Sequence, residues 1–364
     1  MTGAEGPSSG LRDAVASLDP GYFALVMASG IVAIASAQTG YRGLSDVLLG
    51  FTLAALVVLG VVYLLRVVIF WDTVVRSWRD PTTAMAFFTV VAGLDVVAVR
   101  VSMAGHPQIT LGLAAAAALL WLVLTYGLPA SLVASARRPV LGEINGTWLI
   151  WVVATQSLSV VATVLAPTAP ASALRAELPV VAVCLWGVGV MLYLILIVII
   201  FMRLLLVEVT PAEMGPAYWI AMGATAIGVR AAAGIVDLHE RAAVHLQGEL
   251  RPFVIGLSVV LWAFGTWWIP LLVAFGVWRY LVRRYPWSYE PRLWSVVFPL
   301  GMYAVASMTL GRAGGFGFMV SIARVWVFVA VVAWALVMAA ALRSLATALW
   351  SRRRRRGTPR AIGS

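Results

Sequence analysis

Residues 47–65 read VLLGFTLAALVVLGVVYLL, a stretch that contains no charged residue. A helix crosses the hydrocarbon core of a bilayer with about 20 consecutive apolar residues. This stretch is therefore predicted to be a membrane-spanning helix. The whole chain agrees with that prediction, because 62% of its 364 residues are hydrophobic and 11% are charged, whereas soluble domains carry about 25% charged residues.

Nine more apolar runs of similar length flank this stretch, and short polar breaks separate them. The ten runs cover residues 21–39, 47–70, 81–103, 111–134, 146–165, 178–206, 216–236, 253–282, 293–309 and 325–349. Strands of a membrane barrel alternate apolar and polar residues over about ten positions, and these runs are longer and continuously apolar. The sequence predicts an all-α integral membrane protein with ten transmembrane helices.

The distribution of arginines predicts the orientation of the chain. The formal net charge is +11, and the chain contains no lysine, so arginine supplies all of the basic charge. The breaks after the even-numbered runs hold the larger number of arginines, namely Arg76, Arg79, Arg137, Arg138, Arg203, Arg279, Arg283 and Arg284. The opposite breaks hold fewer, among them Arg42, Arg175 and Arg241. Cytoplasmic loops carry the excess of basic residues. We therefore expect a multi-pass protein of the cytoplasmic membrane with both termini in the cytoplasm, and we assign the charge to orientation rather than to a nucleic acid.

The same reading divides the chain into three parts. Residues 1–19 are interpreted as a flexible cytoplasmic leader, residues 20–350 as a ten-helix transport domain, and residues 351–364 as a basic cytoplasmic tail.

Odd- and even-numbered runs differ in composition. The even runs are apolar nearly all round, whereas the odd runs contain small and polar residues, among them Ser29, Gly30, Thr155, Gln156 and Gly301. Small residues let helices approach closely, and polar residues face the interior of a bundle. The alternation predicts five helical hairpins, with odd helices lining a central pore and even helices outside. Close packing around a solid core is the alternative.

Two ionisable residues lie well inside odd-numbered runs. Asp95 follows Pro81 by fourteen positions, and Arg230 follows Pro216 by fourteen, which places both about 21 Å along their helices at ~1.5 Å per residue. Charged residues are costly inside a membrane and usually have a function there. We expect the two to lie at similar depth, where they either form a charge pair or, in the case of Arg230, attract anions.

Signatures of enzymes are missing from the sequence. It contains no Gly-rich phosphate loop, no paired metal-binding motif and no Gly-x-Ser-x-Gly nucleophile motif. Cys184 is the single cysteine, and the three histidines are scattered, so neither a cofactor nor a metal site is expected. We interpret the chain as a transport protein rather than an enzyme.

Four segments carry a resemblance to a known family. They are PGYFALVMASGIVAIA from Pro20, DPTTAMAFF from Asp80, WVVATQSLSV from Trp151 and LWSVVFPLGMYAVA from Leu293. In this order and with ten spans, the chain resembles the tellurite-resistance/dicarboxylate transporter family. That family includes TehA-type channels, plant slow-type anion channels, fungal malate permeases and sulfite efflux pumps.

The resemblance implies an architecture and a gate. It implies five hairpins around a pore within each subunit, a homotrimer, and small anions as the transported partners. Family members close the pore with a phenylalanine on the ninth helix, and the matching residue is Phe298, directly before Pro299. A proline kinks a helix, and a hydrophobic constriction gates by dewetting. The pore-lining candidates are Phe23, Phe87, Phe88, Thr155, Gln156 and Gly301.

The expected function is passage of C4-dicarboxylate, sulfite or inorganic anions, and two alternatives remain. Channel relatives carry prolines in several inner helices, but the third run has Val91 near that place and the fifth has none. This departure favours a proton- or potential-coupled carrier, in which Asp95 is the carboxylate to test. A non-transporting scaffold or an intramembrane enzyme is the more remote alternative.

Overall fold

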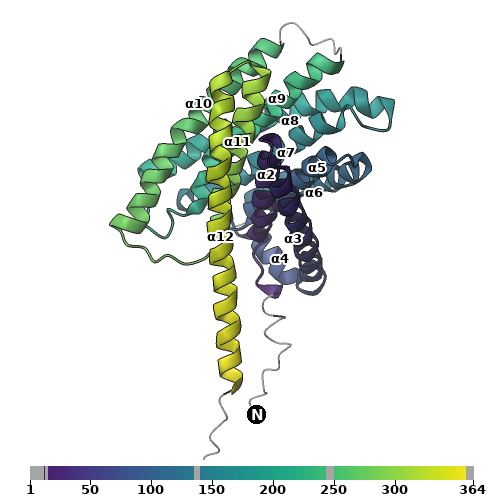
Figure 1. Cartoon of the computed structure of the whole chain (residues 1–364). Coiled ribbons are helices and arrows are strands. Elements are labelled where there is room, and N and C mark those ends of the chain that lie inside the picture. Colours follow the sequence, from purple (N-terminus) through teal and green to yellow (C-terminus); the bar gives the residue numbers. More distant parts are fainter. Residues whose placement is uncertain (1–11, 13–14, 135–139, 243–249, 358–364) are drawn as a thin grey trace, which may run out of the picture.

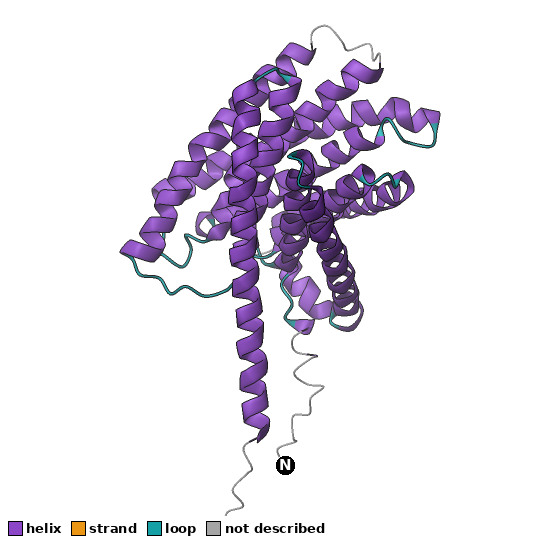
Figure 2. Cartoon of the chain, viewed as in Figure 1, coloured by secondary structure: helices purple, strands orange, loops and turns teal. Residues whose placement is uncertain are grey.

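The computed structural model describes residue 12 and residues 15–134, 140–242 and 250–357, and the described part is helical, with no strand in it (Figure 2). Eleven α-helices are labelled in Figure 1. Their bounds are α2 Ala24–Gln38, α3 Arg42–Ile69, α4 Trp71–Arg79, α5 Phe88–Met103, α6 Pro107–Ala134, α7 Ile150–Leu165, α8 Ser172–Leu206, α9 Ile220–Ala242, α10 Leu250–Val277, α11 Trp294–Ala313 and α12 Gly317–Gly357.

Ten helical stretches in this described part are long and apolar enough to cross a membrane. They coincide with the ten predicted runs, which confirms the prediction of an all-α membrane protein. Helices suit such spans, because in lipid the backbone polar groups have to bond within the segment.

The ten spanning stretches form two sets that differ in burial. We call α2, α5, α7, α9 and α11 the inner helices, and α3, α6, α8, α10 and α12 the outer helices. The apolar windows of the inner helices are 78% to 89% buried, whereas those of the outer helices are 11% to 39% buried. Each inner helix packs on the outer helix that follows it in the chain. The polar and small residues of the odd runs are thus enclosed by the apolar even runs.

The inner helices form a closed ring. Each packs on the next inner helix in the chain, and α11 packs back on α2 (Figure 1). Every inner helix begins with a short 3₁₀ turn; these turns are η1 Pro20–Phe23, η2 Ala84–Phe87, η4 Gly146–Leu149, η5 Pro216–Trp219 and η7 Pro291–Leu293. The five turns also contact one another in sequence, and η7 contacts η1. Five helix N-termini therefore meet at one side of the molecule.

We call this side the terminal side, because η1 begins there and α12 ends there (Figure 1), and we call the other the distal side. The local sequence explains why the helices start at this level. Proline, whose φ suits a helix start, occupies the first position of η1, η5 and η7. The Asp19 and Asn145 side chains accept hydrogen bonds from the Gly21 and Thr147 backbone N–H groups, which are the capping contacts expected at helix N-termini.

One glycine allows two of these turns to touch. A Cβ atom at Gly146 of η4 would clash with the backbone of η5, first with the Ala217 carbonyl oxygen and then with the Tyr218 nitrogen. Both obstacles are backbone atoms, so no side-chain rotation relieves the clash. The contact between α7 and α9 at the terminal side depends on this glycine.

A buried arginine ties the loop before η5 to the outer helix α8. Arg203 donates from Nε to the Gly142 carbonyl oxygen at 3.2 Å, and its Nη2 lies 3.6 Å from Oε1 of Glu213. The backbone N–H and the hydroxyl of Thr210 each donate to Glu213 at 2.9 Å, and these two bonds hold the pKa of Glu213 below its usual value. Glu213 is therefore ionised at neutral pH, and it holds the loop against the side of Arg203.

Several helix boundaries differ from the sequence expectation, most of all those of α12 and α8. Helix α12 begins at Gly317 rather than near residue 325, and α8 begins at Ser172 and contains Pro179. Arg175 and Glu177 precede the expected start of the sixth run and Arg324 precedes that of the tenth, whereas both helices begin before these charged residues. Helix α12 also continues through the expected tail as far as Gly357. Most of the expected leader and residues 358–364 lie outside the described residues.

Candidate functional site

Two cavities lie inside the ring of inner helices. The distal cavity, with a volume of about 20 Å³, is lined by all five inner helices; its residues are Ile31, Ile34, Asp95, Val96, Val99, Ser157, Val160, Ile227, Arg230, Met302 and Val305. The terminal-side cavity, of about 80 Å³, is lined by the starts of α2, α5, α7 and α11; its residues are Asp19, Gly21, Ala24, Thr82, Thr83, Ala86, Thr89, Thr147, Ile150, Glu290, Pro291, Arg292 and Ser295.

Helix register places Phe298 between the two cavities. On α11 it follows Ser295 of the terminal-side cavity by three positions and precedes Met302 of the distal cavity by four. Residues three or four apart share one helix face. The same count on α2 and α5 selects Ala28 and Ala92, both small, so Phe298 is the bulkiest side chain at this level among the three helices. It is 2% exposed.

Pro299 fixes the backbone beside this phenylalanine. It lies inside α11, and without an N–H it leaves the Ser295 carbonyl without its helical donor. Its ring packs against Gly223 of α9, where an added Cβ would come within 2.8 Å of the proline Cγ. The sequence predicted that Pro299 alters the helix beside Phe298. It did not indicate that a glycine on the neighbouring inner helix makes room for the proline ring.

Asp95 and Arg230 line the same distal cavity, as their matched depth predicted. Of the two expected arrangements, a charge pair or an arginine that attracts anions, the first has no direct contact here, because the two form no salt bridge within the described residues. Asp95 is 1% exposed and its Oδ2 lies 2.6 Å from the Ser157 hydroxyl oxygen, whereas its Oδ1 is buried without a partner. The cavity thus holds a carboxyl group and a guanidinium group that do not neutralise each other by contact.

Arg230 extends along its own helix toward the distal end. An added Cβ at Gly234, four positions further along α9, would lie 2.9 Å from its Nη1 and would also clash with Thr163 of α7. Within the described residues Arg230 has no hydrogen-bond partner. A partly buried guanidinium with free donors beside a cavity is suited to holding an anion, since its five N–H groups match oxyanion geometry.

The aromatic pore-lining candidates face other helices instead of the cavities. The Phe23 ring meets Tyr63 of α3 edge-on at 5.1 Å between centroids, and the Phe87 ring lies 5.9 Å from Trp78 of α4. Phe88 stacks on Trp151 of α7 at 6.0 Å. None of the three phenylalanines lines either cavity. In this structure they pack against aromatic side chains of neighbouring helices.

The polar candidates on α7 also point away from the cavities. Thr155 accepts a hydrogen bond from the Trp121 indole of α6 at 2.9 Å, and Gln156 donates to the Trp186 carbonyl of α8 at 3.1 Å. The next residue, Ser157, lines the distal cavity. Gly301 is likewise a packing position, where an added Cβ would lie 2.8 Å from Ile31 of α2.

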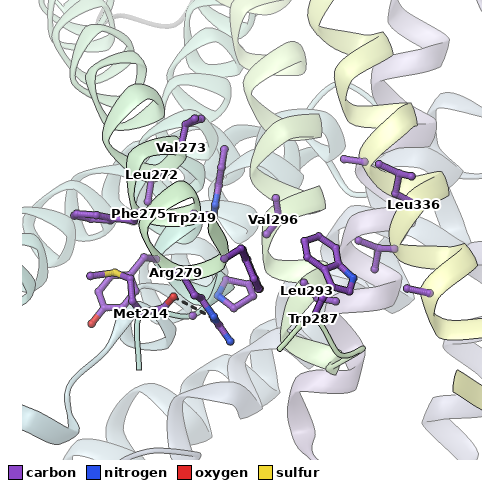
Figure 3. Close-up of a pocket in the computed structure, with 18 residues that line it drawn as sticks. Met214, Trp219, Leu272, Val273, Phe275, Arg279, Trp287, Leu293, Val296 and Leu336 are labelled. Carbon is purple, nitrogen blue, oxygen red and sulfur yellow. Dashed lines mark hydrogen bonds between the residues drawn. The ribbon is translucent and has the colours of Figure 1, made fainter. Parts of the chain in front are cut away.

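A further pocket of about 420 Å³ lies off the ring, between α10 and α12. Figure 3 shows Leu272, Val273 and Phe275 of α10 on one side and Leu336 of α12 on the other, with Val296 of α11 between them. Arg279 lies at its edge and donates to the Met214 carbonyl oxygen at 3.1 Å. The lining is almost entirely apolar, which suits acyl chains better than ions.

Comparison with known proteins supplies the family. The family model SLAC1, described as voltage-dependent anion channel, matches residues 17–342. An uncharacterized membrane protein of Mycobacterium tuberculosis is 46% identical over 147 residues, which cover 40% of this chain and 73% of the relative.

Two relatives from Methanocaldococcus jannaschii are named as uncharacterized transporters. One is 25% identical over 301 residues, covering 81% of this chain and 84% of the relative. The other is 30% identical over 131 residues, covering 36% of each. The region that the family model matches, residues 17–342, includes all inner helices and both cavities.

Proposed function

The chain belongs to the voltage-dependent anion channel family, and from that premise we propose that it passes small anions along the axis of its ring of inner helices. The two cavities carry this proposal, because between them they are lined by residues of every inner helix. Phe298 separates them and is proposed as the gate. Displacement of this ring joins the cavities into one path.

The polar groups along the axis favour anions over cations. Four of the five inner helices, α2, α5, α7 and α11, start at the terminal-side cavity, and each helix N-terminus carries about half a positive elementary charge. Arg292 adds a cation at that mouth, where Asp19 and Glu290 also lie. Arg230 supplies a cation at the distal cavity. Between the cavities the path is neutral and apolar, which allows an anion to leave as easily as it enters.

The proposal extends to substrate, orientation and assembly. We propose dicarboxylate, sulfite or inorganic anions as substrates, and a cytoplasmic terminal side, because Arg76, Arg79, Arg203 and Arg279 lie at the ends of elements on that side. A homotrimer with one path per subunit is the proposed assembly.

A coupled carrier is the second candidate, and the buried carboxyl of Asp95 favours it. Ionisable groups in transporter interiors serve as proton relays. Flux that saturates with anion concentration and requires a proton gradient supports the carrier; flux that rises in proportion to concentration supports the channel.

The test of transport uses purified protein in liposomes. Flux of chloride, nitrate, malate and sulfite is compared with potassium flux in the same vesicles and with empty vesicles. Anion flux well above both controls is the expected result. Equal anion and potassium flux, or none above empty vesicles, contradicts the proposal.

Removal of the Arg230 charge is expected to lower anion flux at low ionic strength. The Arg230→Ala variant loses the cation of the distal cavity, and a fixed charge beside a narrow path raises local counter-ion concentration by about tenfold or more. The loss is expected to shrink as salt rises, because salt screens the field. Arg175→Ala is the matched control, since Arg175 lies at the distal start of α8 outside both cavities. Equal flux and equal salt dependence in the wild type and Arg230→Ala refute the role of this arginine.

A further inference from the structure

Asp95 is a buried carboxyl group whose surroundings do not support a negative charge. Its side chain borders the distal cavity together with Val96, Val99 and other apolar groups. One of its oxygens has no hydrogen-bond partner, and the other contacts a single hydroxyl, that of Ser157. An isolated ionised carboxylate in an apolar site is strongly unfavourable unless it is paired.

The hydrogen bonds of Ser157 point to a proton on this carboxyl group. The Ser157 hydroxyl oxygen lies 2.6 Å from Asp95 Oδ2 and 2.8 Å from the Ala154 carbonyl oxygen. A hydroxyl has one proton to donate but can also accept. If Asp95 is ionised, two acceptors compete for that proton. If Asp95 carries a proton, it donates to Ser157, which donates to Ala154, and both contacts are satisfied.

The charged and titratable groups on the helices packed around α5 leave one cation facing Asp95. Helices α2 and α7 contain no ionisable residue. On α5 itself, Arg100 donates to Asp46 of α3 at 2.6 Å, and the pair neutralises itself. The remaining groups within the described residues are Asp19 and Tyr22 at η1, Arg42, Tyr63 and Arg66 on α3, Tyr126 on α6, Asp237, His239, Glu240 and Arg241 on α9, and Tyr303 and Arg312 on α11. Of the ionisable groups whose side chains the structure describes, only Asp95 and Arg230 border the distal cavity.

The charge of the distal cavity therefore depends on one proton. With Asp95 protonated, Arg230 is the one charged group among the described residues that borders the cavity, and Asp237, two turns further along α9, offsets its positive charge in part. With Asp95 ionised, the carboxylate cancels that charge and repels an incoming anion. The cavity volume of about 20 Å³ is room for about one water molecule, which gives the released proton an acceptor.

We propose that Asp95 is a proton-binding site that controls anion entry to the distal cavity. The protonated carboxyl group admits anions, and its deprotonation excludes them by charge. This inference rests on the proposed anion path. It adds a dependence on pH that the family model and the named relatives do not describe.

The test compares wild type with Asp95→Asn, whose neutral amide keeps the shape of the carboxylic acid and donates to Ser157. Nitrate flux into liposomes is measured from about pH 5 to about pH 9, because nitrate itself does not titrate in that range. Wild-type flux is expected to fall by about tenfold or more toward high pH. Asp95→Asn is expected to keep the high flux at every pH. Glu177→Gln is the control, since Glu177 is an exposed carboxylate of α8 outside both cavities, and this variant is expected to retain the wild-type pH profile.

Infrared spectroscopy of the same proteins separates this inference from the proposed function. A protonated carboxylic acid has a carbonyl band that a carboxylate lacks, and the band is expected in the wild type and absent in Asp95→Asn, whether or not anions move. Wild-type flux that is flat with pH, or a pH profile unchanged in Asp95→Asn, overturns the control of entry. Absence of the band in the wild type throughout the pH range overturns the proton site. Absence of flux in both proteins with the band present contradicts the anion path instead.

Discussion

The Phe298→Ala variant is expected to pass anions about tenfold faster than the wild type, or more, in the same liposomes. Tenfold corresponds to lowering a barrier by about 1.4 kcal/mol. The reason is geometric: helix register sets Phe298 between two cavities, with Ala28 and Ala92 at the same level on α2 and α5. Removing the ring leaves small side chains there and joins the cavities. Flux should rise for chloride, nitrate and malate, and the ranking of the ions then identifies the preferred substrate class.

The control for this variant is Phe88→Ala. Phe88 is as deeply buried as Phe298, but it stacks on Trp151 and lines neither cavity. Both substitutions remove a buried phenylalanine ring and cost about 3–5 kcal/mol of stability, so any general loosening of the bundle appears in both. Increased flux in Phe298→Ala alone supports the gate. Equal flux in the wild type and a folded Phe298→Ala protein removes Phe298 from that role.

The Gly146→Ala variant is expected to lose both thermal stability and anion flux. An alanine Cβ has no space between η4 and η5, and the atoms it meets belong to the Ala217 and Tyr218 backbone. Overpacking costs typically about 1–3 kcal/mol and more where the neighbours are rigid. We expect the unfolding temperature in detergent to fall by about 5 °C or more. Flux falls with it, because the ring of turns opens between α7 and α9.

The matched control is Gly142→Ala, four positions earlier in the chain. An added Cβ at Gly142 meets its nearest atom, a methyl carbon of Val207, at 3.8 Å, which is an ordinary contact. This variant should unfold at the wild-type temperature. If Gly146→Ala is equally stable, the close approach of η4 and η5 does not hold the ring together.

The fold could be predicted from the sequence because hydropathy and burial are linked in a simple way here. Outer helices are continuously apolar, and inner helices mix small and polar residues, so the order of the chain alone separates the two sets. The helix α4 has Trp71 exposed and Asp72 in its first turn. It was missed because its nine residues are too few and too polar to resemble a membrane span. The start of α12 was missed because Arg324, a charged residue, lies inside the helix, and the apolar run was counted from the residue after it.

The sequence predicted the depth of the site residues along their helices, but not the direction in which each side chain points. Counting 1.5 Å per residue placed Asp95 and Arg230 at one level, and the distal cavity contains both. The same method could not choose between Gln156 and Ser157, which differ by about 100° around the axis of α7. An inner helix is covered on every side, partly by the ring and partly by outer helices, so no face is more polar than the rest. The direction of each side chain is set by its neighbours in space.

The convergence of five helix starts on one mouth makes the two ends of the path electrically unlike. An anion at the terminal side meets the positive ends of five helices, and at the distal side it meets five negative ends, which Arg230 opposes from within the distal cavity. A conductor polarised in this way presents a different barrier to the two directions of current. On the proposed anion path, this polarity is expected to make the protein a rectifier, with a direction of easy flow that the backbone sets before any gate moves.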